Sequence, residues 1–132
     1  MKILQPPNWP QPKGYSNGIA AKGTMVFVAG MVGWNESEHF EANDFPGQAR
    51  QALKNIVTVL NEAGARPEHI TRMTWYLVDV DEYNSSLQHL GKIYQEEIGK
   101  VFPAMTGIQV AGLVEKGAKL EIEVTAVIPD RV

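Results

Sequence analysis

Two glutamates, Glu121 and Glu123, lie two residues apart in the segment KLEIEVTAVIP near the C-terminus. Apolar residues alternate with them, which is typical of a strand whose two faces meet different surroundings. The simplest interpretation is a polar face in contact with water, because ionised carboxylates are rarely buried. If one of them instead points into a cleft, partial burial raises its pKa and lets it relay a proton through water. Periodicity by itself favours solvent for both.

Other side chains offer hydrogen bonds or apolar contacts without forming a recognised motif. Tyr15 opens a strand-like segment, where it suits either a half-buried strand position or the edge of a ligand site. Trp34 stands in an irregular segment and either packs locally or lines a pocket. Ser16, Thr106 and Gln109 are further hydrogen-bonding candidates. None of these alternatives is decided by the residues alone.

Recognised motifs for nucleotides and metals do not occur in the sequence. GxGxxG, GxxxxGK[ST] and HExxH are all missing, so no dinucleotide, P-loop or zinc-protease site is indicated. His39, His69 and His89 lie far apart, in an expected loop, turn and helix. Solvated surface histidines explain them best, and a metal site would require them to converge with carboxylates.

Length and composition limit the class of protein. A chain of 132 residues is the size of one domain, and 44% hydrophobic with 20% charged residues is ordinary globular usage. The net charge of -3 gives no electrostatic reason to expect nucleic acid. The absence of cysteine excludes disulfides and thiolate chemistry. Neither a signal peptide nor an apolar run of about 18 residues is present, so we expect a cytoplasmic protein without membrane contact.

The first half of the chain predicts an arm, a hairpin and a helix. Residues 1–13 contain four prolines, which favours an extended arm preceding a single domain at residues 14–132. Residues 14–22 and 25–29 read as the two strands of a hairpin around Gly23 and Thr24. A helix follows, capped by Asn43 or Asp44 and stopped at Gly64. One apolar stripe runs along it: Ala49, Ala52, Leu53, Ile56, Val57, Leu60 and Ala63.

The second half predicts a strand, a helix and two more strands. Residues 70–80 are rich in β-branched and aromatic side chains, as strands are. Residues 82–98 show helical spacing of apolar residues, and residues 106–113 and 119–128 alternate as strands. The order ββαβαββ indicates an α+β fold, with two helices on one face of a mixed sheet. The opposite sheet face would be an apolar exposed surface, so we expect an oligomer to bury it.

Taken in order, several segments resemble one known family. They are the Gly-Tyr-Ser start, VAGMVG, GQARQALKNIVTVLNEAGA, MTWYLVDVDEY, FPAMTGIQV and KLEIEVTAVIP. The chain from about residue 14 is similar to the Rid family of reactive-intermediate deaminases, also called the YjgF/YER057c/UK114 family. The resemblance implies the chorismate-mutase-like α+β fold, a homotrimer with its sheets around a central barrel, and clefts between neighbouring subunits.

The resemblance also implies a reaction. Deaminases of this family hydrolyse enamines or imines such as 2-aminoacrylate to a ketone and ammonia, without a metal or an organic cofactor. Glu121 matches the glutamate that positions the attacking water, so the resemblance implies that Glu121 points into a cleft and not into solvent. Glu123 keeps the interpretation of a solvent-exposed carboxylate. Tyr15 matches an aromatic residue at the mouth of the cleft, and Gly30 a glycine whose backbone approaches the ligand. We also expect the backbone at Thr106 to bind the ligand.

Three positions depart from the family pattern. Met105 stands where a Pro-Ala-Arg step supplies the arginine that binds the substrate carboxylate, so this chain resembles an arginine-lacking branch. Ala29 replaces a usual serine, and Trp34 stands where a smaller residue is common. Methionine cannot pair with a carboxylate, and a buried carboxylate without a partner is costly. Either the pocket is apolar and takes a larger or flatter ligand, or it has lost its activity.

Three functions therefore stay open. The first is an enamine or imine deaminase acting on a small molecule other than 2-aminoacrylate, with 2-aminomuconate as one example. The second is a trimer that binds a small metabolite, or acts as a chaperone, without turnover. The third and weakest is an endoribonuclease, an activity sometimes attached to this family, because the acidic chain offers RNA little to hold.

Overall fold

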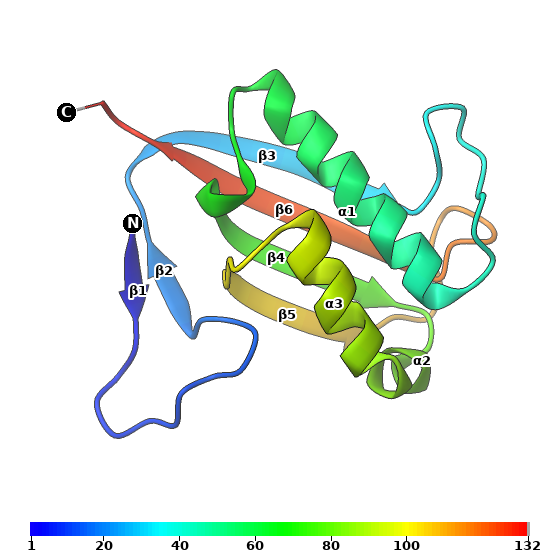
Figure 1. Cartoon of the computed structure of the whole chain (residues 1–132), viewed down its shortest axis with the longest axis horizontal. Helices are drawn as coiled ribbons and strands as arrows, with labels where there is room; N and C mark the ends of the chain where they lie inside the picture. The colour runs from blue at the N-terminus through cyan, green and yellow to red at the C-terminus, as the bar shows by residue number, and fades with distance from the viewer. Residues whose placement is uncertain (132) are drawn as a thin grey trace.

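The computed structural model describes residues 1–131 and contains one four-stranded sheet covered by helices on one face (Figure 1). Its elements follow the chain in the order β1 (Lys2–Leu4), β2 (Gly18–Ala20), β3 (Gly23–Val32), α1 (Phe45–Glu62), a 3-10 turn (Pro67–His69), β4 (Ile70–Leu77), α2 (Val80–Ser85), α3 (Leu87–Glu97), β5 (Ala104–Gln109) and β6 (Leu120–Pro129).

The main sheet has the strand order β3-β6-β4-β5. β6 pairs antiparallel with both β3 and β4, whereas β4 and β5 are parallel. Parallel neighbours need a crossover, and α2 and α3 provide it between β4 and β5 (Figure 1). The predicted α+β class with a mixed sheet and two main helices on one face is confirmed.

Helix α1 begins and ends close to where the sequence predicts. Asp44 is the N-cap residue, although its side chain makes no capping hydrogen bond, and Pro46 occupies the first turn, where no N–H donor is needed. Gly64 follows the last turn with φ +72°, a conformation that favours glycine. Both predicted boundaries are therefore confirmed, but the predicted side-chain cap is not.

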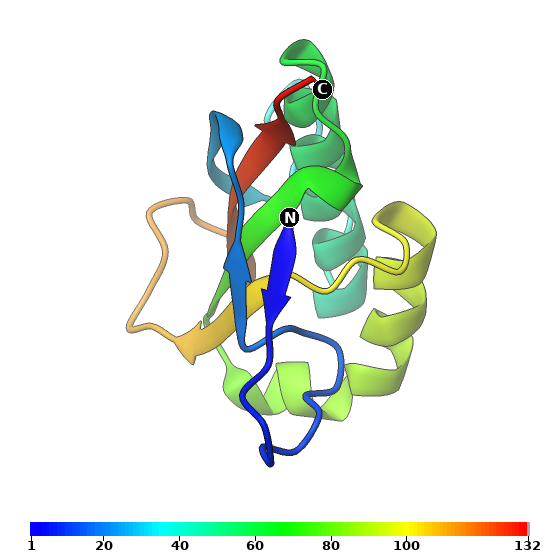
Figure 2. The same cartoon turned by 90° about the vertical axis from the view of Figure 1, so that its left-hand side faces the viewer.

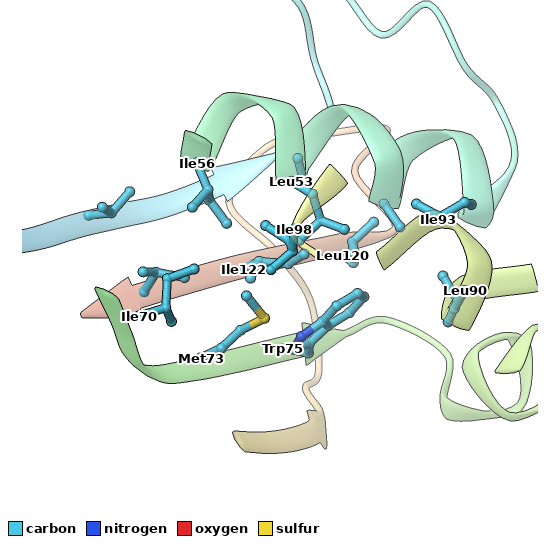
Figure 3. Packing of buried hydrophobic residues seen from close by; sticks show 14 of the residues in the cluster. Leu53, Ile56, Ile70, Met73, Trp75, Leu90, Ile93, Ile98, Leu120 and Ile122 are labelled. Carbon is cyan, nitrogen blue, oxygen red and sulfur yellow. The ribbon is translucent and has the colours of Figure 1, made fainter. Parts of the chain in front are cut away.

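The core lies between the helices and the sheet (Figure 3). Leu53 and Ile56 of α1 are fully buried against β6, where Leu120 and Ile122 alternate inward as the sequence predicts. Each such side chain contributes about 1.5 to 3 kcal/mol when it is removed from water. Ile93 of α3 is 1% exposed and belongs to the same core.

The predicted hairpin of residues 14–22 with 25–29 is wrong. β2 pairs with β1 in a separate two-stranded sheet, with Leu4 opposite Gly18 (Figure 2). β3 instead begins at Gly23 and runs antiparallel to β6, with an irregularity between Val28 and Met31. Only Ala21 and Lys22 separate β2 from β3, yet β2 pairs with the N-terminal segment. A strand inside the arm was not expected, because residues 1–13 contain four prolines and the apolar residues of β1 are only Ile3 and Leu4.

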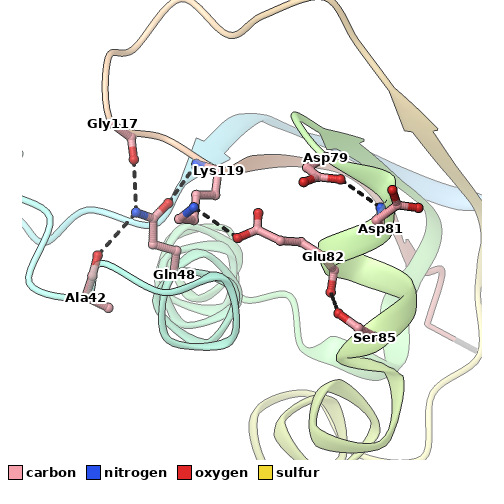
Figure 4. A network of polar contacts seen from close by, with 8 residues as sticks. All are labelled: Ala42, Gln48, Asp79, Asp81, Glu82, Ser85, Gly117 and Lys119. Atoms are coloured by element: carbon pink, nitrogen blue, oxygen red, sulfur yellow. Dashed lines mark hydrogen bonds and ion pairs between the residues drawn. The ribbon is translucent and has the colours of Figure 1, made fainter.

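The predicted second helix is two helices with a break at Ser86. Asp79 caps α2 by accepting a hydrogen bond from the Asp81 backbone N–H at 2.9 Å (Figure 4). The Ser85 hydroxyl donates to the Glu82 carbonyl, and serines that bond locally to the backbone disfavour a continuous helix. Leu87, the first residue of α3, is 52% exposed.

Candidate functional site

The Glu121 carboxylate lies against the backbone of Gly30. β3 carries an irregularity between Val28 and Met31 where it pairs with β6, and Gly30 lies within it. A Cβ atom added to Gly30 would stand 2.0 Å from Glu121 Oε2, so only glycine leaves room for the carboxylate. The structure therefore brings together two residues that the resemblance singled out. Ala29, beside them in the same irregularity, is exposed.

The two glutamates of β6 have different surroundings on the face of the sheet away from the helices. Glu123 is exposed and accepts a hydrogen bond from the Tyr76 hydroxyl at 3.1 Å. That bond, followed by burial and the charges of both glutamates, raises the pKa of Tyr76. Glu121 is half-buried, and within residues 1–131 its carboxylate receives no side-chain hydrogen bond or ion pair. Its oxygens are therefore free to hold a water molecule.

The start of β6 is fixed by the buried amide of Gln48, which is 2% exposed (Figure 4). Gln48 Nε2 donates to the carbonyls of Ala42 and Gly117, and its Oε1 accepts from the Lys119 backbone N–H at 2.8 Å. Lys119 Nζ pairs with Glu82 at 3.0 Å. Because Lys119 precedes Glu121 by two residues, this network anchors the entrance to the strand that carries the carboxylate.

Sequence reasoning missed Gln48, although a signal was present. It falls in the apolar stripe of α1 next to Ala49, where a polar residue without partners would be costly. A polar residue at such a position indicates a specific hydrogen-bonding role. Its partners lie in loops far along the chain, and only the folded structure shows which backbone groups it meets.

A cavity of about 440 Å³ lies on the helix side of the sheet. Met105 and Tyr15, which the resemblance assigns to a ligand site, both line it. It is lined by Lys13, Gly14, Tyr15, Trp75, Tyr83, Leu87, Leu90, Gly91, Tyr94, Gln95, Gly99, Lys100, Phe102 and Met105. Its volume is within the range of small-molecule sites.

Ser16 holds Tyr15 at the rim of this cavity. The Ser16 hydroxyl donates to the Phe102 carbonyl, and its backbone N–H donates to the Pro103 carbonyl at 3.0 Å. The run GYSNG, which sequence reasoning did not count as a motif, has the G-x-S-x-G spacing of serine hydrolases. However, Ser16 is buried, its hydroxyl is occupied, and it precedes a short strand instead of opening a helix. We therefore assign it a structural role.

Met105 and Glu121 lie on opposite faces of the sheet. On β4, Met73 pairs with Met105 and faces the core, whereas Tyr76, three residues later, pairs with Glu121 and faces the other way. Thr106 is exposed on the same side as Glu121. One subunit therefore contains two separate groups of predicted site residues.

Trp34 belongs to neither group. Its ring packs against Phe40 with centroids 5.7 Å apart, and its carbonyl accepts a hydrogen bond from Asn55 on α1. It does not line the cavity that contains Met105. A single chain thus does not bring Met105, Trp34 and Ala29 into one apolar pocket, because they lie on different elements and faces.

Among the described residues, no group of three or more His, Asp or Glu side chains is placed to hold a metal ion. In the same part of the chain, no helix is long and apolar enough to span a membrane.

Comparison with known proteins identifies the family. The family model described as Endoribonuclease L-PSP matches residues 8–128. The chain belongs to the YjgF/RutC/Rid family. A RutC family protein of Aquifex aeolicus is 31% identical over 130 residues, which are 96% of this chain and 99% of that protein. The human 2-iminobutanoate/2-iminopropanoate deaminase is 30% identical over 114 residues, 86% of this chain and 79% of the deaminase.

Solved structures of Rid proteins share the fold. YyfB of Yersinia pestis, a Rid protein of unknown function, superposes with a TM-score of 0.83 at 28% identity, covering 96% of this chain and 98% of that one. TdcF of E. coli, solved with bound serine, has a TM-score of 0.70 at 29% identity, covering 97% and 99%. The chorismate-mutase-like fold expected from the resemblance is confirmed, and the family includes imine deaminases.

Proposed function

We propose that this Rid protein is a hydrolytic deaminase of an enamine or imine larger than 2-aminoacrylate, of which 2-aminomuconate is one example. The observation that carries the proposal is the half-buried Glu121 carboxylate, held against Gly30 and without a side-chain partner among residues 1–131. Family membership supplies the reaction type, since imine deaminases are among its relatives.

Glu121 provides what such a hydrolysis requires. Its carboxylate accepts a hydrogen bond from a water molecule and takes one proton as the water oxygen attacks the C=N carbon. The same group returns that proton to the nitrogen and then carries the hydroxyl proton of the addition product to it as the C–N bond breaks, so that imine and water give ketone and ammonia. A glycine at position 30 leaves its backbone open to the ligand, and Thr106 on the same sheet face offers a second backbone group.

The proposed site is formed between subunits. Met105 and Glu121 lie on opposite faces of one sheet, so the cavity of one copy has to meet the Glu121 face of another. That face also exposes large apolar side chains, with Met25 at 56%, Phe27 at 71% and Ile108 at 49%. A second copy is a suitable cover for these side chains, and we propose a homotrimer. A single monomeric species in sedimentation velocity would refute the proposed homotrimer and the site between its subunits.

The test is a coupled ammonia-release assay with freshly generated 2-aminoacrylate and 2-aminomuconate. We expect turnover of 2-aminomuconate, with about a hundredfold loss in Glu121→Gln, typical of removing a general base. Glu123→Gln is the matched control, since it changes the neighbouring exposed carboxylate and should keep the wild-type rate. Full activity in Glu121→Gln would remove the catalytic role. No turnover of either compound would favour the alternative, a Rid protein that binds a metabolite without turnover.

A further inference from the structure

The floor of the cavity contains a hydrogen-bond donor without an acceptor. Trp75 lines the cavity and is only 5% exposed, and its indole Nε1 is the one buried side-chain polar atom in the described part of the chain that lacks a partner. Tyr83 packs edge-on against the indole, with ring centroids 5.9 Å apart. Buried donors are almost always paired in native proteins, so this one indicates an acceptor supplied by something bound.

The walls above Trp75 are aromatic or aliphatic. Tyr83, Leu90 and Met105 contact the cavity, and Figure 3 shows the indole extending from β4 toward Leu90 on α3. The Tyr94 hydroxyl already donates to the Val101 carbonyl at 2.6 Å, so this residue offers the cavity its ring. Rings of this kind favour planar, unsaturated groups. A charge at this depth would lack a counter-ion and is disfavoured.

The rim of the cavity is positively charged. Lys13 and Lys100 line it, both are exposed, and neither forms an ion pair with another residue of the described chain. Among residues 1–131, no aspartate or glutamate lines the cavity. An anionic group of a ligand therefore has favourable partners at the rim and none at the floor.

We propose that the cavity binds the unreactive end of a conjugated or aromatic substrate, whose uncharged acceptor atom accepts a hydrogen bond from Trp75 Nε1. The carboxylate of this substrate lies at the rim beside Lys13 and Lys100. These lysines supply the positive charge that Met105 lacks. This inference rests on the proposed function and adds a preference within it for substrates that carry a ketone, amide or ring nitrogen at the far end. A dicarboxylate such as 2-aminomuconate lacks that uncharged acceptor, so we expect it to be turned over but to bind more weakly.

The test measures binding without turnover, so that it is independent of catalysis. 4-Acetylbenzoate presents a planar ring, a carboxylate and a ketone, whereas 4-isopropenylbenzoate has the same shape without the acceptor. A third probe, trans,trans-muconate, carries a charge at both ends. Each is titrated into wild type, Glu121→Gln, Trp75→Phe and Trp9→Phe, using calorimetry and the indole N–H resonances of the three tryptophans. Trp9 is 60% exposed on the arm and serves as the control.

We expect 4-acetylbenzoate to bind wild type and Glu121→Gln about tenfold more tightly than either other probe, and to shift the Trp75 indole resonance. Trp75→Phe should abolish the preference, and Trp9→Phe should keep it. Equal affinity for the acetyl and isopropenyl compounds, tighter binding of muconate, or no binding of any probe overturns the proposal. The comparison of probes on wild type stands even if Trp75→Phe does not fold. Selective binding of 4-acetylbenzoate combined with no ammonia release would instead refute the proposed deaminase activity, while the proposed binding site would stand.

Discussion

The carboxylate of Glu121 on β6 lies against the α-carbon of Gly30 on β3. Any larger residue at position 30 would place its side chain where this carboxylate lies. A Cβ there would stand 2.0 Å from Oε2 and 2.7 Å from the carboxyl carbon. The irregularity between Val28 and Met31 in the β3–β6 pairing creates this contact. The position of the carboxylate therefore depends on a backbone feature of the neighbouring strand.

Replacing that glycine should separate activity from stability. In Gly30→Ala the added methyl displaces the end of a flexible side chain, so we expect the free energy of unfolding to fall by no more than about 1.5 kcal/mol. The displaced Glu121 should lose its hold on water, lowering ammonia release by about a hundredfold. Gly112→Ala, whose added Cβ meets nothing within 4 Å, is the control. Unchanged turnover in Gly30→Ala would show that the contact has no catalytic importance.

Restoring a guanidinium to the cavity should change its ligand preference. In Met105→Arg we expect ammonia release from 2-aminoacrylate to appear or to rise about tenfold, because a guanidinium pairs with a carboxylate bidentately. Met105→Leu keeps the apolar lining and should leave the preference as it is. Kinetics with 2-aminoacrylate measure the effect. If Met105→Arg folds but gains nothing, the missing arginine does not explain the expected selectivity.

The Gln48 network should stabilise the start of β6. Gln48→Leu leaves two carbonyls and one backbone N–H without their partner, which we expect to cost about 2 to 3 kcal/mol. For a domain of this size the melting temperature should fall by about 10 °C. Gln88→Leu makes the same chemical change at an exposed position of α3 and should leave the melting temperature nearly unchanged. Equal melting temperatures of the two variants would contradict the role of the network.

Tyr94 should make the protein less stable at high pH. Burial raises the pKa of its hydroxyl above the ordinary value of 10.0. The native state therefore keeps a proton that the unfolded state loses as the pH rises through 10, and its contribution to stability declines there. Tyr94→Phe loses the hydrogen bond to Val101 and should be about 1 kcal/mol less stable at pH 8. Urea unfolding at pH 8 and 11 should show this difference shrinking. A stability difference between wild type and Tyr94→Phe that is larger at pH 11 than at pH 8 would contradict this prediction.

Local patterns in the sequence determined most of the elements. The apolar stripe from Ala49 to Leu60 predicts α1, because a helix repeats every 3.6 residues and buries one side. Alternation at Leu120 and Ile122 predicts which face of β6 enters the core. These patterns are local, so they can be read from the sequence without knowing which elements pack against each other. Together with the family resemblance, they also singled out Glu121 and Gly30.

Tertiary structure decided what pairs with what. The partner of β2 is β1 and not β3, because strand pairing depends on how segments meet in space and not on their distance along the chain. The separation of Met105 from Glu121 follows from the register of three strands, in which a shift of one residue exchanges the faces. The unpaired Trp75 Nε1 likewise follows from burial, which no spacing in the sequence expresses. Periodicity fixes which side of an element is apolar, but contacts between distant residues depend on how the elements pack.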